Sequence, residues 1–345
     1  MQLEKGPTLA YVPTCILAHV TCYNKVVSKS LLVFLSGVLL LGIGFYLYTT
    51  DRISFVSPIP KIFGVSNTDE IHNYWFPRDI GHDYSDLNLS ARSAILVDYD
   101  TGEIIFAKNI HARQPVASTV KIMTALLALK NKNMNDVFTI SQHAAKVGEN
   151  SMILGPGEKL TLEQLLYGMM LVSGNDAATA IGENVAGNED KFVEMMNSAV
   201  QQMGLTDTKY VNPSGLDDDN KTQYSTPYDM AVIAHYLWEN YPQIRGITST
   251  YHKFIDATSD HKDYELYNDT NLLTSYPGVK GIKPGFTWES GLCLVTYAEN
   301  DGKKLLGVIL GSGDRRGEMK EVLDYGYAYY GMKIDHPGLD LKASE

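Results

Sequence analysis

The stretch "SAILVDYDTGEIIFAKN", residues 93–109, holds two β-rich runs around an Asp-Thr-Gly turn and predicts a β-hairpin. Residues 118–205 read mainly as helices, and a closing helix is predicted at 316–331. These elements predict an α/β protein of the α+β type: one antiparallel sheet built from N- and C-terminal strands, covered by helices, with a helical insertion. After the hairpin, strands are expected only at "VKGIKPGF" (279–286), "GLCLVTYA" (291–298) and "KLLGVILGS" (304–312).

The composition limits the possible partners. The chain has 345 residues, 44% of them hydrophobic, which suffices for one large domain or two small ones with a sizeable core. Its formal net charge is −11, and no basic stripe is visible. A phosphate-binding surface needs such a stripe, so we expect neither nucleic acid nor an acidic lipid surface as the target.

One apolar run, "LLVFLSGVLLLGIGFYLY" at residues 31–48, carries no charge. As a helix it would span roughly 27 Å, close to the hydrocarbon thickness of a bilayer. Lys25 and Lys29 precede it, while Asp51 and Arg52 follow, so the basic excess places the N-terminal side in the cytoplasm. The sequence therefore predicts a single-pass membrane anchor with the remaining chain outside. A cleaved signal peptide is the alternative, although no small-x-small cleavage pattern follows the run.

The segment after this run contains Pro, Asp and aromatic residues without a clear period, which suits a spacer. The predicted division of the chain is a cytoplasmic tail (1–30), a transmembrane anchor (31–48), an extracytoplasmic spacer (49–90), a catalytic domain (91–332) and a C-terminal tail (333–345).

A serine and a lysine stand three residues apart in "ASTVKIMTALLALK", residues 117–130. The helix predicted here is apolar nearly all round, so we expect Lys121 to be desolvated, with its pKa lowered toward the range of a general base. Helical spacing places the hydroxyl of Ser118 on the same face. The pair fits a nucleophile beside its base near a positive helix end. The alternative is an N-cap serine with an ordinary lysine that extends to solvent.

Two further segments hold polar groups that could join this pair. In "LVSGNDAATA", Ser173 and Asn175 lie between two predicted helices, where they could simply form a capping turn. They could also bring a second hydroxyl and an amide to the pocket of Ser118. In "GIKPG", Lys283 and Gly285 lie on a late strand, and glycine there permits the close approach of a ligand.

Together, Ser-x-x-Lys, Ser-Gly-Asn and Lys-x-Gly resemble, in order and context, the three motifs of penicillin-binding proteins and serine β-lactamases. The resemblance is closer to serine-type D-alanyl-D-alanine carboxypeptidases, the low-molecular-mass penicillin-binding proteins, and covers roughly residues 91–330. It implies the transpeptidase fold of that group. The segments that carry it are "ILVDYDTGEIIFAKN", "ASTVKIMTALLAL", "LLYGMMLVSGNDAATAIGENVAG", "NPSGLD", "STPYDMAVIAHYL" and "GVKGIKPGFTWESGLCLV".

The resemblance implies a role for each motif residue. Ser118 would attack the carbonyl between two terminal D-alanines of a peptidoglycan stem peptide, and Lys121 would take its proton. Ser173 would relay a proton to the leaving D-alanine, and Asn175 would hold Lys121 and the substrate amide. Lys283 would supply positive charge to the terminal carboxylate of the substrate and to Ser173.

The same resemblance extends to the residues after Lys283. Thr287 would add a hydroxyl to the carboxylate site, and the backbone N–H groups of Ser118 and Phe286 would form the oxyanion hole, beside Gly285. Water would then hydrolyse the acyl-enzyme. No metal or cofactor would be needed, β-lactam antibiotics would be covalent inhibitors, and the enzyme would lie at the bacterial cell membrane with its catalytic domain outside. The family's common β-rich C-terminal domain is not expected here.

Pro284 departs from the family pattern, in which threonine is usual. Along a strand, the backbone groups of one residue point to one edge and those of the next residue to the other, so residues 284 and 286 share an edge and the donor that proline lacks falls on it. Proline is tolerated at a free edge. We therefore expect this strand to lie at the edge of the sheet, with the free edge open to the substrate.

Three alternatives remain. A zinc-dependent D,D-peptidase would need histidines at metal-ligand spacing, which the nine histidines do not show. A class A β-lactamase would need a Glu-x-x-Leu-Asn loop after the Ser-Gly-Asn motif, and none is found. A non-catalytic cell-wall-binding domain would be expected to lack Ser118 or Lys121, and both are present.

Overall fold

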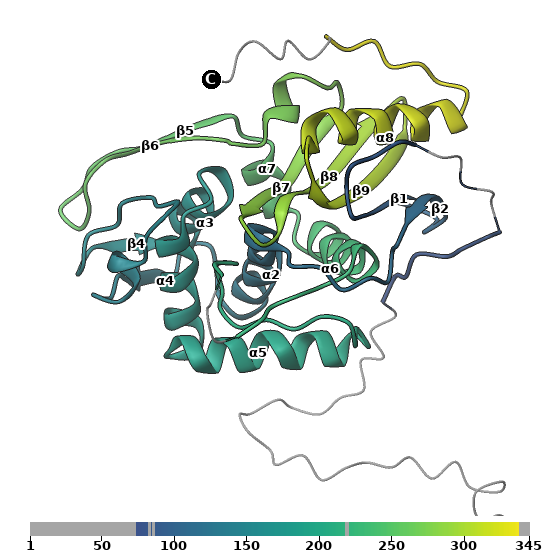
Figure 1. Cartoon of the computed structure of the whole chain (residues 1–345). Helices are drawn as coiled ribbons and strands as arrows, with labels where there is room; N and C mark the ends of the chain where they lie inside the picture. The colour runs from purple at the N-terminus through teal and green to yellow at the C-terminus, as the bar shows by residue number, and fades with distance from the viewer. Residues whose placement is uncertain (1–73, 82–83, 85–86, 218–220, 338–345) are drawn as a thin grey trace, which may run out of the picture. The chain divides into compact units, whose positions relative to one another are not determined.

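The computed structural model describes residues 74–81, 84, 87–217 and 221–337 (Figure 1). The predicted anchor at 31–48 lies outside the described residues. In the part of the chain that is described, no helix combines the length and the apolar character needed to cross a membrane.

A five-stranded antiparallel sheet, in the order β2-β1-β9-β8-β7, is the centre of the domain. Its first two strands come from the predicted hairpin and the other three from the end of the chain, which confirms the sheet expected from the sequence. Strand β7 lies at one edge, as the proline had indicated. The strands are β1 Ser93–Asp98, β2 Ile104–Lys108, β7 Val279–Thr287, β8 Gly291–Asn300 and β9 Lys303–Ser312.

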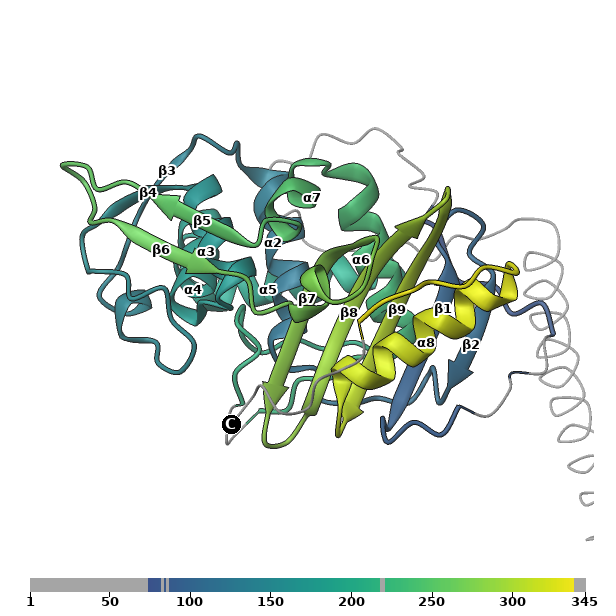
Figure 2. The same cartoon turned by 90° about the horizontal axis from the view of Figure 1, so that it is seen from above.

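Helices cover both faces of this sheet (Figure 2). The closing helix α8 packs on one face, while α6 and the buried α2 lie on the other. The helical block expected between the two halves of the sheet is present. Its elements and those that follow are η1 Ala117–Val120, α2 Lys121–Asn131, η2 Ala144–Lys146, α3 Leu162–Leu171, α4 Asn175–Ala186, α5 Glu189–Gln202, α6 Pro227–Asn240, α7 Gln243–Thr248, η3 Asn271–Thr274 and α8 Arg315–Tyr329.

The alternation of side chains along β1 explains why both faces of the sheet are covered. Ile95 and Val97 belong to the larger apolar cluster on the α2 side, whereas Ala94 and Leu96 belong to the cluster under α8. Successive residues of a strand point to opposite faces, so a strand that is apolar throughout must be buried on both.

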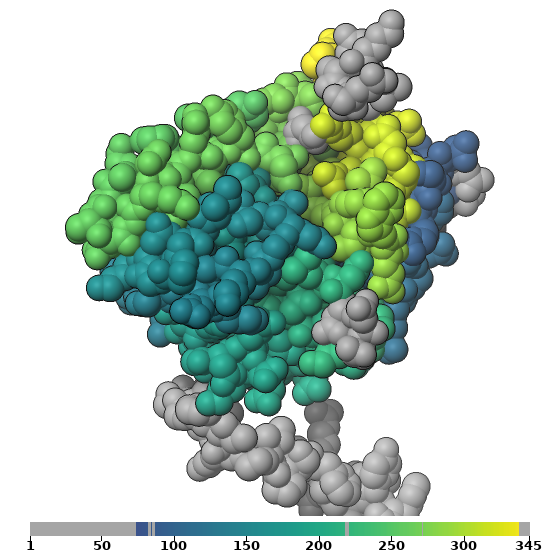
Figure 3. All heavy atoms as spheres, turned by 60° about the vertical axis from the view of Figure 1, so that its left-hand side comes forward, coloured from purple at the N-terminus to yellow at the C-terminus, as the bar shows by residue number. Residues whose placement is uncertain are grey.

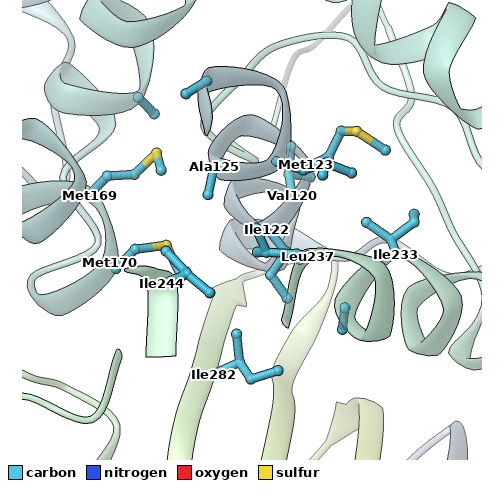
Figure 4. Close-up of a cluster of buried hydrophobic side chains, with 14 of the residues drawn as sticks. Val120, Ile122, Met123, Ala125, Met169, Met170, Ile233, Leu237, Ile244 and Ile282 are labelled. Atoms are coloured by element: carbon cyan, nitrogen blue, oxygen red, sulfur yellow. The ribbon is translucent and has the colours of Figure 1, made fainter. Parts of the chain in front are cut away.

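Helix α2 lies in the middle of the larger cluster. Figure 4 shows its side chains packed among residues of α3, α6, α7 and β7. Every residue from Lys121 to Leu129 is buried, as the apolar sequence had predicted. A polar side chain on this helix is therefore held in a dry and rigid setting.

Four short strands were not foreseen. Strands β3 (Val137–Thr139) and β4 (Lys159–Thr161) form one two-stranded sheet, and β5 (His252–Ile255) and β6 (Tyr264–Tyr267) form another. The expectation that strands return only after residue 279 was therefore wrong. Each strand has three or four residues, which is too short for the period-2 signal to stand out.

Part of the predicted spacer contacts the domain. Trp75 stacks on the ring of His235, with centroids 4.0 Å apart, and the N–H of Arg78 donates to Gly102 O at 2.6 Å. Burial lowers the pKa of His235 to about 4. The described residues just before β1 therefore pack against helix α6 and the β1–β2 turn.

Candidate active site

Ser118 lies in the 3₁₀ turn η1, immediately before α2 begins at Lys121. The sequence had suggested one continuous helix. A 3₁₀ turn has three residues per turn, so side chains three apart are eclipsed and point the same way. Lys121 Nζ accordingly lies 3.0 Å from Ser118 Oγ. The turn is entered through Ala117 at a φ of 47°, a backbone conformation uncommon for a residue with a Cβ atom.

Lys121 has two other partners, both oxygens. Its Nζ lies 2.7 Å from Asn175 Oδ1 and 2.5 Å from the carbonyl oxygen of Ser214. A neutral amine has two N–H donors and one lone pair. With the two donors used by these acceptors, the lone pair is left to accept the hydroxyl hydrogen of Ser118. The geometry therefore matches a general base that is already aligned with its nucleophile.

The environment favours that neutral form. Burial lowers the pKa of Lys121 well below its usual value, and the nearby ammonium of Lys283 lowers it further. The side chain of Lys121 has no exposed surface. A lysine with a lowered pKa is a stronger candidate base near neutral pH than an exposed one.

The loop between α3 and α4 brings the next two residues to Ser118. Asn175 is the first residue of α4, and its Nδ2 donates to the Gly148 carbonyl at 3.0 Å while Oδ1 accepts from Lys121. Ser173 has a φ of 59°, and its buried Oγ has no hydrogen-bond partner among the described residues. A buried hydroxyl without a partner is costly, and a bound ligand could supply the missing bond.

Asp176, the residue after Asn175, holds the segment 148–154 beside this loop. Its carboxylate accepts from the N–H groups of Met152 and Leu154 and from Ser151 Oγ, at distances of 2.7 to 3.0 Å. Asn175 N also donates to Asn150 O at 2.8 Å. The Ser-Gly-Asn segment is therefore attached to the segment 148–154 and held rigid.

Strand β7 approaches Ser118 from the other side. A Cβ atom added to Gly285 would lie 3.0 Å from Ser118 N and 3.1 Å from Ala117 Cβ. A side chain at this position would therefore press on the nucleophile's backbone. Glycine is needed here for close approach, as expected from the sequence.

Lys283, two residues earlier on β7, is buried with no exposed side-chain surface. Its Nζ lies 3.7 Å from Asp269 Oδ1, an ion-pair distance but too long for a hydrogen bond. Among the described residues no group accepts a hydrogen bond from this Nζ. Burial lowers the pKa of Lys283, while Asp269 acts in the opposite direction.

A second cation, Arg315, begins helix α8. Its Nη1 donates to the carbonyl of Gly285 at 2.7 Å, which ties α8 to β7. Arg315, Asp269 and Ser118 all line one cavity. Cations at a cavity with unfilled donors make a site for an anionic group.

Thr287 and Phe286 complete the strand's contribution. The hydroxyl of Thr287 is 3.0 Å from Ser290 Oγ and accepts from Ser290 N at 3.1 Å. Thr287 is therefore already engaged with the β7–β8 turn. Phe286 is about half exposed and packs edge to face with Trp288, with centroids 5.5 Å apart.

The structure brings every predicted site residue together. The cavity has a volume of about 130 Å³. Lys121 contacts Ser118 and Lys283 lies beside Asp269, and both of these partners line the cavity. Its lining residues are Ser118, Glu149, Asn150, Ser173, Asn175, Gly215, Leu216, Asp269, Pro284, Gly285, Phe286, Thr287 and Arg315. Among the described residues no group of three His, Cys, Asp or Glu side chains is placed to hold a metal ion.

Sequence reasoning missed three contributors. The carbonyl of Ser214 lies in "NPSGLD", which had been noted for its resemblance but given no role. Arg315 could have been noticed, because a cation in the first turn of a helix opposes the helix dipole and needs another reason to be there. Asp269 sits in "YNDTN", which reads as an ordinary turn and carried no signal.

Comparison with known protein sequences gives one consistent family. The D-alanyl-D-alanine carboxypeptidase family, peptidase S11, matches residues 81–314. The carboxypeptidase DacF of Bacillus subtilis is 36% identical over 263 residues, which cover 74% of this chain and 67% of that protein. DacA of Escherichia coli is 33% identical over 258 residues, 70% of this chain and 62% of that protein.

Solved structures agree. A variant of the Streptomyces K15 DD-transpeptidase has 29% sequence identity and a TM-score of 0.66, over 70% of this chain and all of that one. Penicillin-binding protein D2 of Listeria monocytogenes, solved in an ampicillin-bound form, has 27% identity and a TM-score of 0.63, over 70% of this chain and 100% of that one.

Proposed function

Since the chain belongs to the peptidase S11 family of D-alanyl-D-alanine carboxypeptidases, we propose that its cavity removes the terminal D-alanine of peptidoglycan stem pentapeptides through an acyl-enzyme on Ser118. The chain is a serine peptidase of the penicillin-binding protein fold, and so a hydrolase. One observation carries the assignment of roles. The two amine hydrogens of Lys121 have acceptors in Asn175 and Ser214, and its lone pair is directed at Ser118 Oγ.

In the acylation step, Ser118 Oγ forms a bond to the carbonyl carbon of the penultimate D-alanine while its proton passes to Lys121 Nζ. The C–N bond to the last D-alanine then breaks, and the leaving amine takes the proton held by Lys121 through Ser173 Oγ, which leaves Lys121 neutral again. This hydroxyl is buried at the cavity and has no other partner among the described residues. The N–H groups of Ser118 and Phe286 stabilise the oxyanion that develops meanwhile.

Substrate recognition rests on positive charge. Lys283 and Arg315 favour the terminal carboxylate of the substrate, and the free edge of β7 offers its backbone to the peptide. Water completes the cycle by attack on the ester, which releases the shortened peptide and returns the proton to Ser118. None of these steps needs a cofactor.

The same pocket accounts for β-lactams as covalent inhibitors. A β-lactam carries a carboxylate and a ring amide whose C–N bond breaks on attack by Ser118. Its amine stays joined to the acyl group through the opened ring and does not leave the pocket. The related protein from Listeria monocytogenes has been solved in ampicillin- and cefotaxime-bound forms. We propose that penicillin forms a long-lived ester with this chain at Ser118.

The decisive experiment is mass spectrometry of a purified pentapeptide muropeptide after incubation with the enzyme. Loss of one alanine is expected, whereas cross-linked products or unchanged substrate would contradict the proposed reaction. Ser118→Ala should abolish both this loss and labelling by fluorescent penicillin. A covalent adduct formed by Ser118→Ala at a normal rate would disprove the nucleophile assignment.

We also propose that residues 31–48 anchor the enzyme in the bacterial cell membrane, with the domain outside. The uncharged apolar run and the basic residues before it support this. A chain beginning near residue 50 should be soluble and active, because every proposed catalytic group lies after Ala117. Recovery of the full-length, unprocessed chain without detergent would contradict the anchor.

A further inference from the structure

The two-stranded sheet β5–β6 presents different residues on its two faces. The inner face packs on the domain: Ile255, Tyr264 and Leu266 are buried in the main core, and Lys253 Nζ lies over the ring of Tyr167, 4.8 Å from its centroid. This face is explained by packing. The register pairs His252 with Tyr267 and Phe254 with Glu265, so these four side chains share the opposite, outward face.

The outward face is aromatic and exposed. Phe254 and Tyr267 are 48% and 51% exposed, and Tyr251, just before β5, is 54% exposed. The Tyr267 ring stacks on His252 with centroids 4.5 Å apart and meets Tyr251 edge to face at 6.2 Å. The β5–β6 sheet forms part of the molecular surface in Figure 3 (green, upper left). A contiguous group of exposed aromatic rings is unusual on a domain surface and makes this face a candidate binding surface.

A carboxylate lies within this aromatic group. Glu265 Oε1 accepts from the Tyr267 hydroxyl at 2.8 Å and lies 3.2 Å from His252 Nε2. Ring faces combined with polar groups at their rims suit a ligand that is apolar on its faces and hydroxylated at its edges. A sugar ring has this character. A polyanion is disfavoured, because the face carries Glu265 and the chain has a net charge of −11.

The aromatic face is continuous with the active site along the chain. Tyr267 is two residues before Asp269, which lines the cavity of Ser118, so their Cα atoms are at most about 7 Å apart. A fully extended pentapeptide reaches about 17 Å. The glycan to which the stem peptide is attached therefore lies within reach of these rings when the peptide's end is at Ser118.

We propose that the outward face of β5–β6, formed by Tyr251, His252, Phe254, Glu265 and Tyr267, binds the uncharged glycan strand of peptidoglycan. The proposal rests on the function proposed above and adds a sugar subsite to it. The enzyme would then prefer stem peptides that are still attached to glycan over free peptides. The rings would stack on sugar faces, and Glu265 would accept hydrogen bonds from sugar hydroxyl groups.

The test compares two substrates with the same pentapeptide, one free and one attached to a glycan oligomer. Wild-type enzyme should have the higher kcat/KM for the glycan-linked substrate. In the double variant Phe254→Ala with Tyr267→Ala, this preference should fall about tenfold, because two stacking rings are lost. Cleavage of the free peptide should not change. Chitin, an insoluble and uncharged glycan strand without peptides, should co-sediment with wild type and not with the variant.

Two variants serve as controls. Tyr329→Ala removes another exposed tyrosine whose hydroxyl donates to a glutamate, Glu103, at 2.6 Å, and it should leave the preference intact. Tyr267→Phe keeps the ring and should retain most of the preference. Melting temperatures close to wild type show that all variants are folded, and either single substitution on the hairpin can replace the double variant.

The possible failures are distinguishable. If wild type cleaves both substrates equally and does not bind glycan strands, the sugar subsite is disproved while the carboxypeptidase function stands. If neither substrate is cleaved, the proposed function fails, and co-sedimentation with glycan strands still decides whether the face binds sugar. If the double variant instead changes from dimer to monomer by sedimentation, with no glycan binding in wild type, the face is an interface between two copies and the proposal is overturned.

Discussion

The start of helix α2 and strand β7 each bring a buried lysine to the same cavity, yet they prepare the two lysines differently. Lys121 contacts three oxygens, from Ser118, Asn175 and Ser214. Lys283 has no hydrogen bond to any described residue and faces Asp269 at 3.7 Å. Burial lowers the pKa of both.

The difference indicates what each lysine is prepared to do. A base must have its lone pair directed at the nucleophile before the substrate arrives, so its other positions are occupied by protein groups. A cation that binds an anion must keep donors unfilled until the ligand supplies the acceptor. We therefore assign proton transfer to the α2 side of the cavity and carboxylate recognition to the β7 side.

The largest effect is expected on the α2 side. Lys121→Ala should slow acylation by fluorescent penicillin by roughly a thousandfold, because the general base is lost. The fold should be retained, because loss of a desolvated amine offsets part of the cost of the cavity that the truncated side chain leaves, and melting temperature checks this. The matched control is Lys130→Ala, at the exposed end of the same helix, which should label at the wild-type rate. Near-normal labelling of Lys121→Ala would show that another group is the base.

The approach of β7 to α2 can be tested at Gly285. Its added Cβ in Gly285→Ala would press on Ser118 N and Ala117 Cβ, displacing the nucleophile by a fraction of an ångström. We expect kcat/KM to fall roughly ten- to a hundredfold, because small displacements of reacting groups are costly. Gly246→Ala in α7 is the control: its Cβ would have no neighbour within 4 Å, and activity should be unchanged. Equal activity of both variants would refute the close approach.

A smaller change is expected from Pro284→Thr. Strand β7 is at the sheet edge, so a threonine N–H there is tolerated, and its hydroxyl could bond the substrate carboxylate. Such a bond to a charged group contributes about 1.5 kcal/mol at the lower end of its usual range, so kcat/KM for D-Ala-D-Ala peptides should rise roughly tenfold. Thr287 is engaged with Ser290 and is poorly placed to supply the same bond. A large fall in melting temperature or in kcat/KM would show that Pro284 is structurally required.

The coupling between the two lysines can be measured from the pH dependence of the acylation rate. The Lys283 ammonium lowers the pKa of Lys121, so Lys283→Met should raise the pKa of Lys121. The base acts when it is deprotonated. The acid limb of the pH profile of the acylation rate should therefore move to higher pH, even if the maximal rate also changes. Lys280→Met, which removes an exposed lysine of the same strand that is paired with Glu299 of β8, should not move this limb. An unchanged limb in Lys283→Met would show that the two sites are independent.

Local sequence patterns predicted much of the fold. The hairpin, the three late strands, the closing helix and the buried α2 were all confirmed, because each has a long period-2 or apolar signal. The strands β3 to β6 were missed because they are short. The 3₁₀ turn at Ser118 was read as part of an α-helix, since both conformations place residues three apart on one side.

The sequence by itself determined which residues could carry the chemistry, because residues three apart, such as Ser118 and Lys121, meet through local geometry alone. The tertiary structure decided the rest. The dry setting of Lys121, its acceptor on Ser214, the ion pair of Lys283 with Asp269 and the arrival of Arg315 all join segments far apart in the chain. Desolvation and charge at a site depend on which distant segments pack there, and no local pattern encodes that packing.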